Sequence, residues 1–438
     1  MRKLGIYIHI PYCERKCGYC DFLSFAGSTR ESRDRYRDAV WNELKWWAKT
    51  YGKAQYREAP YSVDAEYEVD TIFIGGGTPS VMESWSLWRL VLVVKDLFNC
   101  SDKLEITAEA NPNSLDVDKM SVWGVFGVNR LSFGVQSFDD GVLETLGRLH
   151  TAKEAEERFR TARKYFYKNI SIDLMFGIPG QTLDSWRETL DRAIALGPDH
   201  ISFYSLQLEE GTPIYNKVKS GALAPVSDET DRAMYHSAVE KLTAAGYVHY
   251  EISNAAKPGF ESRHNLKYWS MDEYLGVGLG AASYMKAAPY HPFVAKGAER
   301  CDCGPDCISC AGDGTVRDEV ARKRIDRYGV RFRNITDYDV YLEGDDPVDP
   351  ASVHVNNLED YVSEFFFTGL RKIAGVRLAD LEAATGKPAG ELKTPDGEPV
   401  ETVIDRHVSD GLLERKGDTV RLTAKGLDLA NTVLRDFV

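Results

Sequence analysis

The sequence contains no apolar run long enough to cross a membrane and no excess of positive charge. Its most apolar helical stretch, residues 87–98, carries Arg89, Lys95 and Asp96 and is shorter than the roughly 20 residues that a membrane-spanning helix needs. The N-terminus has neither the apolar core nor the small-residue cleavage site of a secretion signal. With 54 Lys and Arg against 67 Asp and Glu, the formal net charge of −13 disfavours a polyanion as the main partner. We therefore expect a cytoplasmic protein with no transmembrane segment and no nucleic-acid partner.

Cysteine is scarce, with 8 in 438 residues, but it is clustered, and in the cytoplasm close cysteine spacings favour metal ligands over disulfides. Cys13, Cys17 and Cys20 follow an apolar run in the spacing C-x3-C-x2-C. A cubane iron-sulfur cluster has four irons that prefer thiolates, so three cysteines leave one iron open to a substrate or cosubstrate. The alternatives are a disulfide, or a zinc site completed by His9 and Asp21. The spacing is unlike the paired C-x2-C of structural zinc, and we expect an iron-sulfur cluster.

Strand-like and helix-like segments alternate through the first 245 residues. Six strands each followed by a helix predict an α/β protein, most simply a partial (β/α)6 barrel of the TIM type. The expected strands are residues 4–10, 69–74, 104–109, 130–135, 170–176 and 200–206. The expected helices are residues 30–51, 83–98, 116–126, 139–165, 183–196 and 228–245.

Polar residues follow these strands, at the end of a barrel where active sites lie. The run 75–79 (GGGTP) allows backbone amides to approach a ligand such as phosphate, although it also suits a tight turn and lacks the lysine of a P-loop. Glu109 ends the third expected strand, Gln136 follows the fourth with Arg148 further along, and the fifth carries Asp173. Together they suit an amino-acid moiety and a ribose diol.

Four runs together resemble a known superfamily: residues 7–22 (YIHIPYCERKCGYCDF), 75–79 (GGGTP), 134–138 (GVQSF) and 173–180 (DLMFGIPG). They are similar to radical S-adenosylmethionine (SAM) proteins, in the branch of oxygen-independent coproporphyrinogen oxidases and HemW-type haem chaperones. The resemblance implies a 4Fe-4S cluster on Cys13, Cys17 and Cys20, SAM on the fourth iron, and an electron donor such as flavodoxin or ferredoxin. It also implies that SAM contacts Tyr7, Tyr19, Gly77, Thr78, Glu109, Gln136, Arg148 and Asp173.

Two details separate the branches of this family. The decarboxylase pattern has a further cysteine two positions after the third, where this sequence has Phe22. Residues 264–269 (HNLKYW) resemble the HNxxYW signature of the haem chaperones. The resemblance therefore implies haem contact by His264, Tyr268 and Trp269. Without it, His264 reads as a turn cap and the two aromatic residues as core.

The chain continues past the expected barrel, residues 1–285, into two further regions. Residues 286–328 form an insertion with Cys301, Cys303, Cys307 and Cys310, which suit structural zinc, an auxiliary iron-sulfur cluster or an unmetallated redox-active loop. Residues 329–438 predict helices and a β-hairpin that resemble a winged-helix module, which the family implies is a cover domain. Its helices are expected at 358–370, 378–384, 400–410 and 424–437, with the hairpin around residues 416–418.

The sequence thus predicts a radical SAM protein of tetrapyrrole metabolism, and we expect a haem chaperone that passes haem to an acceptor protein. Two alternatives stay open. One is a radical SAM enzyme that acts on a porphyrin or porphyrinogen, and the other is a non-catalytic iron-sulfur sensor. Whether catalysis is retained is open as well.

Overall fold

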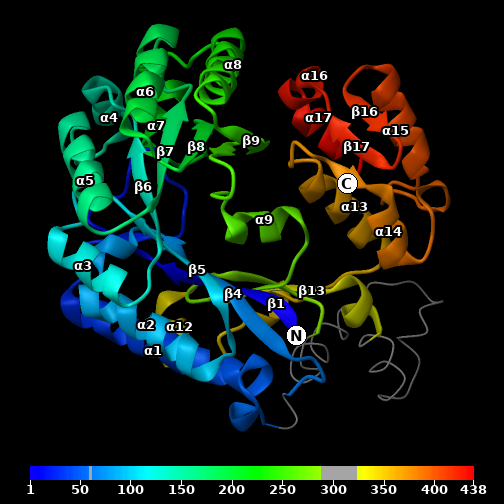
Figure 1. The fold of residues 1–438 in the computed structure, drawn as a ribbon, viewed down its shortest axis with the longest axis horizontal. Helices are drawn as coiled ribbons and strands as arrows, with labels where there is room; N and C mark the ends of the chain where they lie inside the picture. Colours follow the sequence, from blue (N-terminus) through cyan, green and yellow to red (C-terminus); the bar gives the residue numbers. More distant parts are fainter. Residues whose placement is uncertain (59–61, 288–322) are drawn as a thin grey trace.

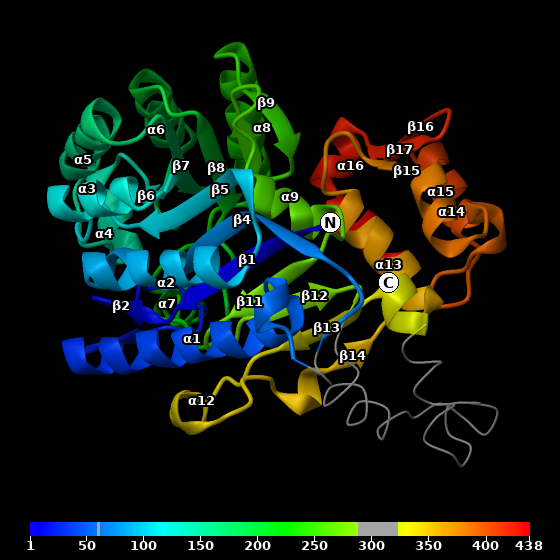
Figure 2. The ribbon, with the colours of Figure 1, turned by 60° about the horizontal axis from the view of Figure 1, so that its bottom comes forward.

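A curved sheet with helices on its outer face forms the body of the protein (Figures 1 and 2). This computed structural model describes residues 1–58, 62–287 and 323–438. Within these residues the sheet has twelve strands in the order β14-β13-β12-β11-β1-β4-β5-β6-β7-β8-β10-β9. Seven of them are parallel: β1 (Arg2–Ile10), β4 (Tyr67–Gly76), β5 (Cys100–Ala110), β6 (Arg130–Gln136), β7 (Asn169–Phe176), β8 (His200–Ser205) and β11 (Tyr274–Val277).

The sheet is open, as expected of a partial barrel, because β9 and β14 are its two edges. Antiparallel strands extend it on both sides: β10 (Asn254–Ala256) and β9 (Val248–Glu251) beyond β8, and β12 (Ala282–Met285), β13 (Val330–Arg333) and β14 (His354–Val355) beyond β11. Sequence periodicity did not predict these extensions, which consist of two to four residues each.

The six expected strands are confirmed to within a few residues, and so are most of the expected helices. The first β/α units contain α1 (Arg30–Tyr51), α2 (Ser84–Leu97), α3 (Val117–Val125), α4 (Asp140–Leu146), α5 (Ala152–Tyr165) and α6 (Leu183–Leu196). After β8 come α7 (Pro213–Lys219), α8 (Asp228–Ala244) and α9 (Arg263–Trp269), and α12 (Tyr338–Glu343) follows β13. The single helix expected at 139–165 is wrong. The chain forms α4 and α5, because Gly147 ends α4 with a left-handed φ of 76° and Thr151 starts α5 with a capping box.

The parallel strands form the buried centre of the curved sheet, and the outer helices cover one of its faces. Leu4, Ile6, Ile8 and Ile10, which share one face of β1, are all fully buried, and Gly5 and His9 on its other face are buried as well, so both faces of this strand are covered. A buried carboxylate fixes α1 against later parts of the chain: Glu43 accepts hydrogen bonds from the Gly278 amide (2.8 Å), Asn334 (2.7 Å) and Tyr341 (2.6 Å), and also from Trp47.

The C-terminal unit stands beside the open side of the sheet, with α9 between them (Figure 1). It contains α13 (Leu358–Gly369), β15 (Val376–Arg377), α14 (Leu378–Thr385), α15 (Val400–Ser409), β16 (Leu413–Lys416), β17 (Thr419–Leu422), α16 (Ala424–Asp428) and α17 (Ala430–Arg435). Of the expected elements, the hairpin is present as β16 and β17, and β15 adds a third strand in the order β15-β17-β16. The likeness to a winged-helix module stays a prediction. The last helix, expected to be continuous, is divided at Leu429. Met271, Tyr274 and Tyr284 share a core with Phe366 of α13, so the unit packs on the segment after α9.

Along the described residues, no helix combines the length and the apolar character that a membrane crossing requires. The four cysteines of the insertion, Cys301, Cys303, Cys307 and Cys310, lie outside the described residues.

Candidate functional site

A cavity of about 370 Å³ opens at the carboxyl ends of the parallel strands. All three N-terminal cysteines line it, as do seven of the eight residues expected to contact SAM. These seven are Tyr19, Gly77, Thr78, Glu109, Gln136, Arg148 and Asp173. The carboxyl ends of parallel strands lie at one edge of the sheet. The cavity at this edge therefore gathers residues that are far apart in the sequence, up to the 154 positions between Tyr19 and Asp173.

The cysteine loop leaves β1 and is held at both of its ends. β2 (Tyr12–Cys13) pairs in parallel with β3 (Phe25–Ala26), and within the loop the Cys20 amide donates to the Cys17 carbonyl at 3.3 Å. The three cysteines form no disulfide. Among the described residues, no three Cys, His, Asp or Glu side chains converge closely enough to hold a single metal ion.

The glycine run 75–79, which begins in the last two residues of β4, supports this loop and is not a phosphate cradle. Its amides are already paired: Gly76 donates to Glu109 (3.2 Å), Gly77 to the Ile10 carbonyl (2.8 Å) and Thr78 to the Tyr12 carbonyl (2.7 Å). A Cβ at Gly77 would meet the Tyr12 carbonyl oxygen at 2.7 Å, so only glycine permits this approach.

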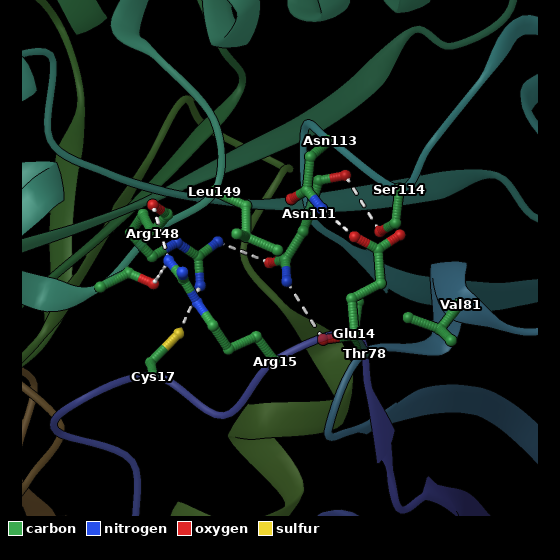
Figure 3. A pocket seen from close by; sticks show the side chains of 11 residues that line it. Glu14, Arg15, Cys17, Thr78, Val81, Asn111, Asn113, Ser114, Arg148 and Leu149 are labelled. Carbon is green, nitrogen blue, oxygen red and sulfur yellow. Dashed lines mark hydrogen bonds between the residues drawn. The ribbon is translucent and has the colours of Figure 1, made fainter. Parts of the chain in front are cut away.

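Two side chains donate hydrogen bonds to the cysteine sulfurs. The Thr78 hydroxyl lies 3.5 Å from Cys13 Sγ, and Arg148 Nη1 lies 3.4 Å from Cys17 Sγ (Figure 3). Arg148 reaches this position because the break between α4 and α5 places it in the turn after Gly147. Its second nitrogen, Nη2, donates to the Gly134 carbonyl at the end of β6 (2.5 Å).

The cavity also contains two carboxyl groups in a low-dielectric setting. Burial, together with the nearby Asp173, raises the pKa of Glu109 to about 8. Burial also raises the pKa of Asp173, against the opposing effect of hydrogen bonds from Ser202, Ser132 and Ser171. Glu109 is therefore protonated at neutral pH until a ligand supplies hydrogen-bond donors or positive charge.

Gln136 has a backbone conformation that side chains rarely adopt. Its φ is 70°, one of only two positive values at non-glycine residues in the described chain. The strain turns its amide into the cavity, where Oε1 accepts from the Tyr204 hydroxyl at 3.1 Å. Strain at a cavity residue is typical of a ligand-binding position.

Tyr7 does not line the cavity. It lies in β1, where it is partly buried, and its hydroxyl hydrogen-bonds to His9 Nδ1 at 3.0 Å. His9 Nε2 in turn lies 2.9 Å from the Leu23 carbonyl, in the loop that carries the cysteines. Through His9, the Tyr7 hydroxyl is thus connected to the loop that carries the cysteines. The contact of Tyr7 with SAM stays a prediction.

Residues 264–269, which resemble the haem-chaperone signature, lie on α9 and do not line the cavity. His264 is fully buried, with Nδ1 2.8 Å from the Thr71 hydroxyl and Nε2 2.9 Å from the Tyr268 hydroxyl. Burial lowers the pKa of His264 to about 3, so the ring is neutral. The buried indole N–H of Trp269 has no partner among the described residues. Haem contact by these three residues stays a prediction.

Sequence reasoning missed two side chains of the site. Tyr204, near the end of β8, and Asn111, directly after β5, both line the cavity. Asn111 stands in the run 109–112 (EANP) beside an expected contact, and Tyr204 lies near the end of the sixth expected strand, so strand-end position was the available signal.

The fold, the cysteine loop and the cavity define a radical SAM protein. The family model described as the radical SAM superfamily matches residues 7–193, and that of the HemN C-terminal domain matches residues 356–429. The heme chaperone HemW of Bacillus subtilis is 34% identical over 436 residues, covering 99% of this chain and 98% of that protein. HemW of Escherichia coli is 38% identical over 280 residues, or 64% of this chain and 69% of that protein. The chain belongs to the HemW family.

Among solved structures, coproporphyrinogen III oxidase (HemN) of Escherichia coli has the same fold. Its TM-score is 0.75 at 20% identity, over 100% of this chain and 90% of that one. At this identity the likeness concerns the fold.

Proposed function

We propose that this protein is a haem chaperone that retains radical SAM machinery: it binds haem and passes it to an acceptor protein. The observation that carries the proposal is the convergence of Cys13, Cys17 and Cys20 on one cavity with Glu109 and Asp173. Full-length similarity to proteins named heme chaperone supports the haem-binding part.

The cavity residues fit the two groups that the superfamily implies. Cys13, Cys17 and Cys20 would hold a 4Fe-4S cluster, and Thr78 and Arg148 already donate to two of their sulfurs. When bound, the cluster supplies the electron that cleaves the carbon-sulfur bond of a sulfonium compound, and an electron donor such as flavodoxin or ferredoxin would supply it in turn. The volume of about 370 Å³ lies near the lower end of ligand pockets and suits one SAM-sized molecule.

The side chains of the cavity would orient SAM and hold its charges. Glu109 and Asp173 accept hydrogen bonds from hydroxyl or ammonium groups once ionised, and Gln136 offers an amide held by Tyr204. The apolar cluster of Met175 and Leu206 beside Tyr19 lines the same cavity and excludes water from one side of it.

For haem, we propose contact by His264, Tyr268 and Trp269. Their family signature and the buried, unpartnered indole N–H of Trp269 support this assignment. The Nε2 atom of His264 must leave the Tyr268 hydroxyl before it can bind iron, so haem binding would require α9 to rearrange.

Haem titration of anaerobically purified protein tests the proposal. We expect His264→Ala to weaken haem binding while iron and sulfide stay equal to wild type. Tyr268→Phe keeps the ring but frees His264 Nε2, so it should bind haem at least as tightly as wild type. Thr71→Val, which removes the hydrogen bond to Nδ1 and leaves the imidazole in place, is the matched control.

Unchanged haem affinity in His264→Ala would refute the role of that residue. Wild-type protein that contains the cluster but binds no haem would refute the chaperone function. Formation of 5′-deoxyadenosine together with a modified porphyrin would indicate an enzyme of tetrapyrrole metabolism instead.

We also propose the division of the chain into a core at 1–285, a metal-binding insertion at 286–328 and a cover domain at 329–438. Strands β13 and β14, at residues 330–355, still pair with the core sheet, so the cover domain would be joined to the core by a shared sheet. Zinc or an auxiliary iron-sulfur cluster at Cys301, Cys303, Cys307 and Cys310 belongs to the same proposal.

A further inference from the structure

One amide side chain connects the two hydrogen bonds that reach the cysteine sulfurs. Asn111 Oδ1 accepts from Arg148 Nη2 at 2.6 Å, and Asn111 Nδ2 donates to Thr78 Oγ1 at 3.1 Å (Figure 3). Arg148 and Thr78 are the same side chains that donate to Cys17 and Cys13. The result is a continuous bridge from one sulfur to the other.

The directions of these hydrogen bonds follow from the groups themselves. An arginine has donors only, so the Asn111 atom that faces Arg148 must be the oxygen, and the NH2 group must face Thr78. A hydroxyl has a single proton. Because Thr78 Oγ1 already accepts from Asn111, its proton is free to point at Cys13 Sγ, 3.5 Å away.

The backbone around Asn111 holds the bridge in place. The Asn111 amide donates to Ser80 Oγ at 3.1 Å, and its carbonyl accepts from the amides of Ser114 and Leu115, both at 3.2 Å. Pro112 restricts the backbone of the residue before it, which is Asn111. The backbone of Asn111 is thus held at its N–H and at its carbonyl group. The side-chain amide is therefore already in position before any cluster binds.

We propose that Asn111 is a positioning residue that sets the reduction potential of the cluster by aiming Thr78 and Arg148 at two of its thiolates. Hydrogen bonds to the sulfurs of an iron-sulfur cluster stabilise its more negative, reduced state and raise its potential. The inference rests on the proposed cluster at Cys13, Cys17 and Cys20.

Asn111→Asp replaces the side-chain amide by a carboxylate of almost the same shape, which reverses the direction of the hydrogen bond with Thr78. A carboxylate at this position accepts the Thr78 proton and draws the Arg148 guanidinium toward itself, so both sulfurs lose donors. Asn111→Leu removes the bridge without adding charge. Asn113→Asp is the matched charge control, since Asn113 lies on the same loop but donates to Glu14 Oε2 at 2.7 Å and takes no part in the bridge.

The experiment is a potentiometric titration of anaerobic full-length protein without SAM, with dithionite as the electron source and the electron paramagnetic resonance signal of the reduced cluster as the readout. At a fixed potential we expect the ratio of reduced to oxidised cluster to fall on the order of tenfold in Asn111→Asp, less in Asn111→Leu and least in Asn113→Asp. Resonance Raman spectra of the iron-sulfur stretches should shift in the Asn111 variants alone.

Equal midpoint potentials in wild type and Asn111→Leu, or equal shifts in Asn111→Asp and Asn113→Asp, would overturn the inference. Loss of iron from the Asn111 variants alone would also overturn it, because the bridge would then retain the cluster without tuning it. Absence of a cluster from wild type is a different result, which contradicts the proposed function.

Discussion

Replacing Glu109 with glutamine should make the protein more stable at neutral pH and weaken its binding of SAM. Burial and Asp173 raise the pKa of Glu109 to about 8 from an ordinary value of 4.5. Between these two values the folded chain holds a proton that the unfolded chain has released, so the stability of the folded state falls as pH rises. Each pH unit above 4.5 costs about 1.4 kcal/mol, which amounts to about 3 kcal/mol at pH 7.

Glutamine at position 109 has no such cost, and its oxygen can still accept from the Gly76 amide. Thermal unfolding of matched anaerobic samples should therefore give a higher melting temperature for Glu109→Gln above pH 6, and equal values near pH 4.5. Glu188→Gln, at an exposed position of α6, controls for the loss of one carboxylate. A variant that is less stable than wild type from pH 6 to 8 would refute this reasoning.

The same carboxyl group should make SAM binding depend on pH. If the ligand favours ionised Glu109, the affinity of wild type should fall up to about tenfold for each pH unit below 8. Isothermal titration should show this slope reduced in Glu109→Gln, which cannot ionise at position 109. If SAM affinity depended on pH equally in the two proteins, the charged groups of SAM would lie away from Glu109.

Three further outcomes are expected. Gln136→Gly relieves the strained φ of 70° but removes the side-chain amide from the cavity. In titration, SAM affinity should fall at least about tenfold, and in calorimetry the melting temperature should stay equal or rise. A lower melting temperature would contradict this expectation. Glu43→Leu removes the acceptor of four hydrogen bonds and should cost roughly 3 kcal/mol or more in urea unfolding, whereas a loss below 1 kcal/mol would show that the site relaxes. Replacing the four insertion cysteines by serine should remove one zinc and leave the iron content unchanged, and a loss of iron in elemental analysis would instead indicate a second cluster.

Much of the core was predictable because its signals are local. Strands such as Asn169–Phe176 are short apolar runs bounded by helix caps, and the spacing of Cys13, Cys17 and Cys20 is itself a ligand pattern. Parallel strands place their carboxyl ends at one edge, so their order in the sequence was enough to gather Glu109 and Asp173. The break before Arg148 was also visible, since Gly147 is a helix-ending residue and Thr151 with Glu154 matches a capping box, but periodicity across 139–165 outweighed it.

The short antiparallel strands at both edges of the sheet were not predictable, because strands of two to four residues depend on partners far away in the sequence. The position of His264 was not predictable either. Its signature predicts haem contact, which stays a prediction, but it does not show that Thr71, 193 residues earlier, and Tyr268 hydrogen-bond to both ring nitrogens in this structure.

The sequence by itself determined the β/α order, the three thiols and the set of polar residues at the strand ends, since each depends on neighbours within a few positions along the chain. Only the tertiary structure decided what those residues do to one another. The proton of Thr78 points at Cys13 because Asn111, which directly follows β5, donates to its oxygen, and Asn111 is oriented by Arg148 from the turn between α4 and α5. The direction of a hydrogen bond depends on atoms that folding alone brings within about 3 Å, and no spacing along the chain encodes it.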